Sequence, residues 1–506
     1  MNGVINVVTR SAAETRGGMA TLLLGTNDQA QAGLRYAAGL GSQGAVRVYG
    51  AGSTEGPSDL ENGASDIDDW DLGQGGFRAD FSRGTSQTVT VQGDVYASRG
   101  GQDLEQPTPV PPFVQAVEED LTAHGGNVLG RWTRRFSLQS DLALQAYVDY
   151  AARSQPSSFG RIHVTTFDVD FQHHFPLGSR QDFSWGLEYR RISDDISGTF
   201  SVSFDPPDRT VDLLTGFVQD EIVLAQNQLA LNLGAKLEHN DYTGFELQPT
   251  GRFLWTPTLS TSFWGAVSRA VRTPSRVDSD IHIVAQVFDA PPVTQIVLRG
   301  SDTLAAEELV AYEVGYRVVP HERLSFDITG YYHQYHQLRS FTPLPPESSG
   351  GTAVVPFIVT NDARAETVGG TASLTFRLSS SWRVRGSYTY VNETAGLEDD
   401  APPGAIPDAN PGLNPHHQIG LWSSLDLPKN LELDLLARYV SPLHIDPPVN
   451  DYVQADVQLG YKIGESLRLA LIGRDLFSPR HVEFPRSATS RRAIERQFRV
   501  KGSWTF

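Results

Sequence analysis

The feature that most constrains the fold is a two-residue alternation of apolar and polar side chains that recurs along the whole chain. The final segment, R-Q-F-R-V-K-G-S-W-T-F, places Phe498, Val500, Trp504 and Phe506 on one parity and Gln497, Arg499, Lys501, Ser503 and Thr505 on the other. Successive side chains of a β-strand point to opposite faces, so this segment predicts a strand with one apolar and one polar face. Equivalent alternation marks residues 142–150, 229–238, 324–329 and 431–438.

The connections between the predicted strands are of two alternating kinds. Ten are tight turns, at residues 41–44, 83–86, 137–140, 177–180, 225–228, 257–260, 320–323, 379–381, 428–430 and 464–466. The others are longer and polar, among them residues 56–74, 99–127, 194–210, 273–308, 339–362, 392–415 and 478–492. Ten short turns joining eleven long-looped hairpins predict 22 strands, the first near residues 19–24 and the last ending at Phe506.

The number of strands indicates which face points outward. A barrel of about eight strands can fill its interior with side chains, whereas a barrel of about 22 encloses a wide lumen, so its apolar face must meet lipid. We therefore expect an all-β fold, a 22-stranded antiparallel transmembrane β-barrel with short periplasmic turns and long extracellular loops. The last strand must pair with the first, because an open edge in hydrocarbon leaves backbone groups unpaired.

Composition excludes several other classes. No run of 18 apolar residues is present, so the sequence offers no transmembrane helix. The absence of cysteine excludes disulfides and thiol chemistry, and a net charge of −18 disfavours nucleic acid as a partner. No phosphate-binding loop, nucleophile elbow or metal-ligand histidine spacing appears. We therefore expect no enzyme activity, no catalytic residue, no metal site and no cofactor.

Four internal segments and the last residue carry a family resemblance. They are N-G-V-I-N-V-V-T-R-S at 2–11, S-R-A-V-R-T-P-S at 268–275, L-A-A-E-E-L-V-A-Y-E-V-G-Y-R at 304–317, G-R-D-L-F-S-P-R-H-V-E-F at 473–484, and the final Phe506. In this order the chain resembles a TonB-dependent outer-membrane receptor over essentially its whole length. The resemblance implies uptake of a scarce ligand, such as a ferric siderophore, cobalamin or haem, across the outer membrane of a Gram-negative bacterium.

The resemblance also implies partners and a domain boundary. The implied partners are the TonB complex, the barrel-assembly machinery that recognises the last aromatic strand at Phe506, outer-membrane lipid and lipopolysaccharide, and a small-molecule ligand. The receptor is expected to be a monomer. Residues 1–12 match the end of the family's plug domain, and residues 13–506 form the barrel. A signal peptide, a TonB-contact box and the rest of the plug would precede Asn2, so we expect Met1 to be a truncated start.

Two alternatives remain open at this point. If Met1 is the true start, the chain would resemble a passive, porin-like channel. If the apolar parity is buried, the chain would be a soluble all-β protein of the adhesion or glycan-binding kind. Nothing in the sequence identifies the ligand.

Candidate ligand contacts follow from strand parity. In Y-Y-H-Q-Y-H-Q-L-R, parity places Tyr331, His333 and Tyr335 on the lumen side near the long loops, where aromatic rings and an imidazole suit an iron chelate. Arg272 suits a ligand that bears carboxylate or phosphate groups. The alternatives are ordinary lumen lining for the aromatic residues and pairing with lumen carboxylates for the arginine. His416 and His417 adjoin, so in a strand they point to opposite faces.

Overall fold

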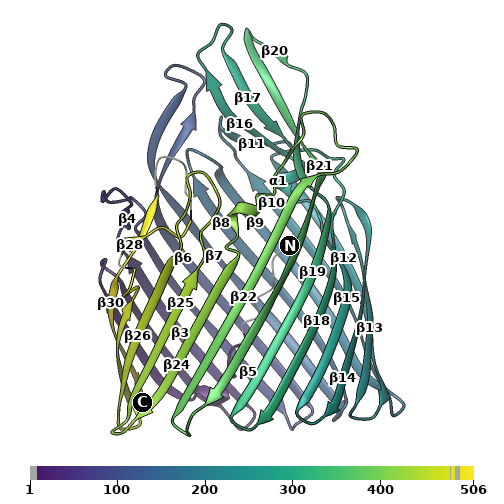
Figure 1. Ribbon diagram of the computed structural model, residues 1–506, viewed down its shortest axis with the longest axis vertical. Coiled ribbons are helices and arrows are strands. Elements are labelled where there is room, and N and C mark those ends of the chain that lie inside the picture. Colours follow the sequence, from purple (N-terminus) through teal and green to yellow (C-terminus); the bar gives the residue numbers. More distant parts are fainter. Residues whose placement is uncertain (1–7, 479, 485–490) are drawn as a thin grey trace.

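The computed structural model describes residues 8–478, 480–484 and 491–506. Within them, 22 strands form a closed antiparallel barrel in which β1 (Gly17–Gly25) pairs with β30 (Gln497–Thr505) (Figure 1). The strands between them are β2 (Ala30–Leu40), β3 (Gly44–Glu55), β5 (Trp70–Arg83), β6 (Gln87–Pro107), β7 (Val114–Ser137), β8 (Ser140–Gln155), β9 (Gly160–Leu177), β10 (Gln181–Ile196), β12 (Asp208–Ala225), β13 (Leu229–Asn240), β14 (Gly244–Thr258), β15 (Thr261–Arg272), β18 (Glu307–His321), β19 (Leu324–Pro343), β21 (Thr352–Arg377), β22 (Trp382–Leu397), β24 (His417–Leu427), β25 (Leu431–Val440), β26 (Tyr452–Ile463) and β27 (Leu467–Arg474). No helix among the described residues is long and apolar enough to span a membrane.

The apolar parity of the wall strands faces outward. Leu233 is 46% exposed and Val314 is 62% exposed, and the alternating residues Phe498, Val500 and Trp504 of the last strand are exposed in the same way. The opposite parity carries ion pairs, such as Lys236 with Glu238 at 2.8 Å. An apolar outer face needs lipid around it, so this orientation overturns the soluble all-β alternative.

All ten predicted tight turns join neighbouring strands at one end of the barrel, which we call the turn end. The long connections lie at the other, the loop end, although residues 26–29, 156–159 and 241–243 there are short. The prediction that residues 99–127 form a loop is wrong. β6 and β7 continue as a paired ribbon to Pro107 opposite Val114. Their backbone N–H and C=O groups hydrogen-bond to each other in this ribbon, whereas in a loop they would bond to water.

An extension of the wall's own sheet rises above the loop end (Figure 1). It contains β11 (Val202–Phe204), β16 (Ile281–Phe288), β17 (Thr294–Arg299), β20 (Glu347–Ser349) and the outer part of β21, and β17 pairs with β21 in parallel. We call it the loop-end sheet. Its apolar residues are buried in two small clusters. One holds Phe113, Val284, Val287, Val297 and Val354, and the other holds Ile196, Val202, Phe204 and Ile281.

Short elements complete the loop end. The helix α1 (Arg276–Ser279) precedes β16, and η2 (Pro411–Leu413) and β23 (Ile406–Pro407) lie between β22 and β24. β4 (Asp59–Leu60), β28 (Arg480–His481) and β29 (Arg492–Glu495) form a three-stranded sheet. Arg492 contacts Asp66 at 2.7 Å and Asp68 at 2.9 Å, so loops from the two ends of the chain are tied together beside the closure of the barrel.

The N-terminal segment runs along the lumen face of β3 and β5. The Ala12 amide donates to Asp80 Oδ2 at 2.7 Å, and Arg47 donates to the Arg10 carbonyl at 2.8 Å. Ala12 is fully buried, and η1 (Ala13–Thr15) follows it. Residues 8–16 are therefore held inside the barrel before the first strand begins.

Candidate functional site

The lumen face of β19 carries the three predicted ligand contacts side by side. The rings of Tyr331 and His333 are stacked with centroids 4.8 Å apart, and Tyr335 meets His333 edge-on at 6.2 Å. All three are half-buried, so part of each side chain remains accessible. The alternation of β19 places Tyr332 on the outer face, opposite Tyr312 of β18. The structure thus brings Tyr331, His333 and Tyr335 together as one aromatic strip.

A carboxylate lies beside this strip. Glu313 of β18 pairs in register with Tyr331, and its Oε1 is 3.8 Å from His333 Nε2. That distance suits an ion pair but is too long for a hydrogen bond, and the buried Nε2 makes none among the described residues. The sequence reasoning missed Glu313. Pairing the two strands of the hairpin 307–343 in sequence could have pointed to this residue. The pairing is not fixed by the sequence, however, because a register shift between Val318 and His321 decides which residues face each other.

Tyr331 is held in place by a glycine on the next strand. A Cβ atom at Gly369 would lie 2.3 Å from Tyr331 Oη, so only glycine leaves room for the ring to lie flat against β21. A glycine covered by a neighbouring aromatic ring is a known stabilising pair in β-sheets. The position of the tyrosine therefore depends on a residue 38 positions away in the chain.

Arg272 lies at the base of the long loop between β15 and β18. Its guanidinium donates two hydrogen bonds to Glu307, at 2.7 and 2.8 Å, and a third to Asp278 at 3.3 Å. Arg339 donates to the other oxygen of Asp278 at 2.8 Å and also binds Asp408. We call these five residues the loop-base cluster. Arg272 is thus paired with carboxylates, and the alternative left open by the sequence describes its position in the structure.

Asp278 is the centre of the loop-base cluster. It is 2% exposed and accepts hydrogen bonds from the amide and hydroxyl of Ser275 at 2.9 and 2.8 Å. Burial works to raise the pKa of this carboxyl, but the hydrogen bonds from Ser275 and Arg339 outweigh it, so the pKa lies below its usual value. Asp278 thus ties the start of the loop to Arg272 of β15 and Arg339 of β19, while Glu307 at the far end of the loop binds Arg272.

Two neighbouring arginines are also paired: Arg269 in the same segment and Arg276, which directly follows it. Arg269 binds Glu308 at 2.6 Å, and Arg276 binds Asp280 at 2.5 Å and Asp194 at 3.2 Å. This segment therefore positions the loop by ion pairs.

The remaining histidines do not gather at the lumen strip. His416 lies against His444 of the next loop, with ring centroids 5.8 Å apart, while the neighbouring His417 contacts Tyr388 and Tyr390. The expected divergence of His416 and His417 is seen. In the described part of the chain, no group of three or more His, Cys, Asp or Glu side chains is placed to hold a metal ion.

Phe506 completes the closure of the barrel. Its amide donates to the Gly18 carbonyl at 3.0 Å, and the Gly18 amide donates back at 2.6 Å. A Cβ atom at Gly18 would lie within 2.1 Å of the Phe506 ring. The last residue is therefore paired with the first strand through both its backbone and its ring.

Comparison with known proteins agrees with this architecture. The family model described as "TonB dependent receptor-like, beta-barrel" matches residues 14–476. None of the curated protein sequences compared with the chain matches it significantly.

Solved structures with the same fold come from several bacteria. A mutant of the ferric enterobactin receptor of Pseudomonas aeruginosa, in complex with enterobactin, is 14% identical, with a TM-score of 0.79 over 100% of this chain and 83% of its own. The siderophore receptor PirA of Acinetobacter baumannii is 13% identical, with a TM-score of 0.78 over 99% and 81%. The FrpB iron transporter of Neisseria meningitidis is 13% identical, with a TM-score of 0.76 over 97% and 81%.

The family match, the closed 22-stranded wall and the division into a turn end and a loop end agree among the described residues. The turn end is therefore periplasmic and the loop end extracellular. Proteins of this family bind small-molecule ligands and interact with TonB, and they are transporters and receptors, not enzymes. The chain belongs to the TonB-dependent receptor family and is an outer-membrane receptor for TonB-dependent uptake.

Proposed function

We propose that this receptor takes up a ferric siderophore or a similar iron chelate, and that the aromatic strip of β19 contacts it. The observation that carries the proposal is the stacked set of Tyr331, His333 and Tyr335 on the lumen face. Aromatic rings and an imidazole offer flat faces to the aromatic groups of an iron chelate. Three of the structures with this fold are described as siderophore receptors or iron transporters, which supports the same ligand class.

Arg272 enters this proposal through the loop that it holds. Its donors already bind Glu307 and Asp278, so a ligand carboxylate would have to replace one of those partners. We propose that its main contribution is to position the loop between β15 and β18 above the aromatic strip. A direct contact would follow only if the ligand opens the loop-base cluster.

We further propose that residues 1–12 are the end of a plug domain and that residues 13–506 are the barrel. Residues 1–7 lie outside the described part of the chain. Support comes from residues 8–16, which are hydrogen-bonded to Asp80 and Arg47 on the lumen wall. A plug leading into that segment would contact the TonB complex from inside the lumen.

The remaining partners belong to the same proposal. Recognition of the terminal strand by the barrel-assembly machinery would use Phe506, whose ring lies exposed on the outer face. We place the receptor as a monomer in the outer membrane of a Gram-negative bacterium, in contact with lipopolysaccharide. The outward apolar parity of the wall supports that location.

The test is to measure the affinity of the purified receptor in detergent for a ferric catecholate chelate. Quenching of tryptophan fluorescence reports the binding. Replacing Tyr331 or Tyr335 with alanine should weaken binding about five- to tenfold, because each removes one ring contact. Tyr332→Ala is the matched control, since Tyr332 is the neighbour that faces outward. Equal affinity in all the variants would refute the proposed contact.

A further inference from the structure

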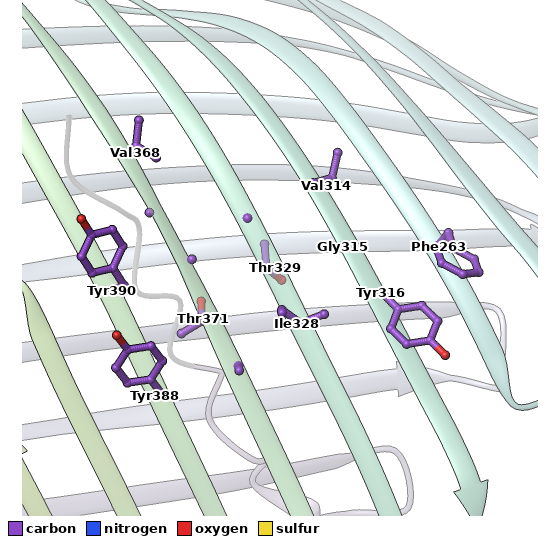
Figure 2. Close-up of a pocket in the computed structure, with 14 residues that line it drawn as sticks. Phe263, Val314, Gly315, Tyr316, Ile328, Thr329, Val368, Thr371, Tyr388 and Tyr390 are labelled. Carbon is purple, nitrogen blue, oxygen red and sulfur yellow. The ribbon is translucent and has the colours of Figure 1, made fainter.

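The outer face of the barrel carries a groove that ligand uptake does not use. It crosses β15, β18, β19 and β21 along a row in which three of the five residues are glycines (Figure 2). Cross-strand pairing defines this row, which runs through Gly265, Val314, Gly330, Gly370 and Tyr390. The row two residues nearer the turns holds Phe263, Tyr316, Ile328, Ala372 and Tyr388, and the row two residues nearer the loops holds Val267, Tyr312, Tyr332 and Val368. Larger residues therefore stand on both sides of a glycine floor.

Two hollows lie along this floor. One has a volume of about 590 Å³ and the other about 790 Å³, and both are lined by Val314, Gly330 and Val368. They form one continuous depression, which we call the outer groove. Figure 2 shows Tyr388 and Tyr390 at one end of it, with Val314, Tyr316 and Phe263 toward the other.

Two glycines of the groove floor, Gly330 and Gly370, differ from lumen-facing glycines, whereas the third, Gly265, is covered by the ring of Phe253. On the lumen side, Gly369 is covered by the ring of Tyr331 and Gly315 by the ring of Trp264. On the outer side, the nearest side-chain atom to a Cβ built at Gly330 is Val314 Cγ2, at 3.9 Å. At Gly370 the nearest atoms all belong to the backbone. Aromatic rings therefore cover these two lumen glycines, whereas no side chain covers Gly370 and none comes closer than 3.9 Å to a Cβ at Gly330.

One end of the outer groove is polar. Tyr388 Oη lies 2.9 Å from His417 Nδ1, and the ring of Tyr390 lies 5.3 Å from that of His417. His417 is the first residue of β24 at its loop end and is exposed. This end can exchange hydrogen bonds with a polar group, whereas the floor offers only apolar contact.

The groove lies at the height of the hydrocarbon layer. Gly330 is six residues along the strand from Leu324 at the turn, which for a tilted strand is about 15 Å. The apolar band of an outer-membrane barrel is about 25 Å tall, so the floor is near its middle. The flanking residues Tyr312 and Tyr316 are four positions apart, about 13 Å between Cα atoms before their side chains narrow the gap.

We propose that the outer groove binds one acyl chain of a membrane lipid, whose polar linkage or head group is held by Tyr388, Tyr390 and His417. A single extended chain fits between the flanking rows, whereas the side-chain layer of a second barrel is too broad to reach the glycine floor. Because lipid tails are as apolar as the wall, the gain comes from packing against the floor rather than from a hydrophobic effect. The chain fills the space that no side chain covers.

The experiment uses the whole chain in nanodiscs of dimyristoylphosphatidylcholine that contain a small amount of phosphatidylethanolamine with a diazirine at the end of its acyl chain. After illumination, labelled tryptic peptides are quantified by mass spectrometry. Peptides 300–317, 324–339 and 365–377 line the groove, while peptide 136–153 carries the outward residues Leu144 and Val148 of β8. We expect about tenfold more label on the groove peptides, equivalent to about 1.4 kcal/mol of selective binding. Equal labelling of all four peptides would overturn the proposal in the unmodified protein.

The second arm of the experiment uses a variant in which a larger side chain fills the outer groove. Gly330→Leu should lower groove labelling to the level of peptide 136–153, because a Cβ there meets nothing closer than 3.9 Å and the leucine side chain would occupy the floor. Gly130→Leu is the control, since a Cβ there meets nothing within 4 Å and the residue lies outside the groove. Undiminished labelling in Gly330→Leu would overturn the proposal. Groove labelling that is lost in nanodiscs holding two copies of the chain, but seen in nanodiscs holding one, would instead assign the groove to a second copy.

Discussion

The barrel wall and the loop-end sheet use the same two-residue alternation in opposite senses. In the wall, the apolar residues lie outside, and Val314 is 62% exposed. In the loop-end sheet, the apolar residues lie inside, and Val297 is 2% exposed. The difference teaches that alternation defines two faces but that the surrounding solvent decides which face is outside: hydrocarbon around the wall, water around the sheet.

The surroundings of the charged side chains also differ between the two regions. In the wall they point into the lumen, as Arg190 does toward Asp168 at 2.9 Å. At the loop end they meet around a buried carboxylate, Asp278, where the loop joins the barrel. Lumen charges line a space that water can enter, whereas the loop-base cluster replaces water with protein partners.

A charge on the lipid face gives the largest expected effect and the most direct way to break the comparison. Leu233→Arg should lower the free energy of unfolding by about 2 to 4 kcal/mol, because the guanidinium would sit in hydrocarbon. Asn232→Arg, on the neighbouring lumen position, should cost far less. Reversible folding into lipid vesicles measures both variants, and equal costs would show that the face assignment is wrong.

Removal of the buried charge at the loop base comes next. Asp278→Asn should destabilise the loop between β15 and β18 by about 2 to 3 kcal/mol, because two arginines lose a shared carboxylate that is only partly screened. Hydrogen exchange of residues 273–306 reports the loss. Glu347→Gln is the control, since its ion pair with Arg299 is exposed and should leave exchange unchanged. Similar exchange in the two variants would mean that the cluster does not hold the loop.

A cavity in the loop-end sheet should have a smaller and local effect. Val297→Ala should cost about 2 kcal/mol in the opening of residues 281–299, because it leaves a void in a closed cluster. Val314→Ala should cost little, since lipid can fill the space on the outer face. Amide exchange of residues 281–299 measures local opening of the loop-end sheet, and unfolding of the whole barrel measures global stability. Comparing these two measurements separates a local effect from a global one. A global loss of barrel stability in Val297→Ala would show that sheet and wall unfold together.

The smallest expected effect is a pH dependence of the loop-end sheet. Burial, with a contribution from Arg299, lowers the pKa of His282 in β16. The unfolded segment therefore binds a proton that the folded sheet does not, so stability is present above the usual histidine pKa of about 6.5 and falls as the pH drops through it. The ratio of exchange rates between the unmodified protein and His282→Gln, measured at pH 7.5 and at pH 5.5, cancels the intrinsic effect of pH. A ratio that does not change would remove His282 as the cause.

Several features of the fold could be predicted from local patterns. The ten turns and the 22 strands follow from alternation and turn residues, because both are properties of a few neighbouring residues. The length of the β6–β7 ribbon could not, since its Pro-rich and Gly-rich end resembles a loop until the partner strand is known.

Only part of the candidate site could be predicted from local sequence patterns. Parity alone placed Tyr331, His333 and Tyr335 on one face, but the approach of Glu313 depends on the register shift between Val318 and His321. Without that shift Glu313 would pair with Tyr332, and Tyr331 and His333 would then lie on the opposite face from Glu313. Likewise the bidentate partner of Arg272 lies 35 residues away, beyond a loop whose path the sequence does not specify.

The sequence by itself determined the alternation, the turns and hence a closed wall with one apolar face, because each is set by neighbours along the chain. The tertiary structure alone decided the loop-end sheet, the loop-base cluster and the outer groove. Each of these forms where strands distant in sequence meet, and its geometry depends on their registers and on which glycines are covered by a neighbouring ring. Local pattern fixes the direction of a side chain, and contact across strands decides what that side chain meets.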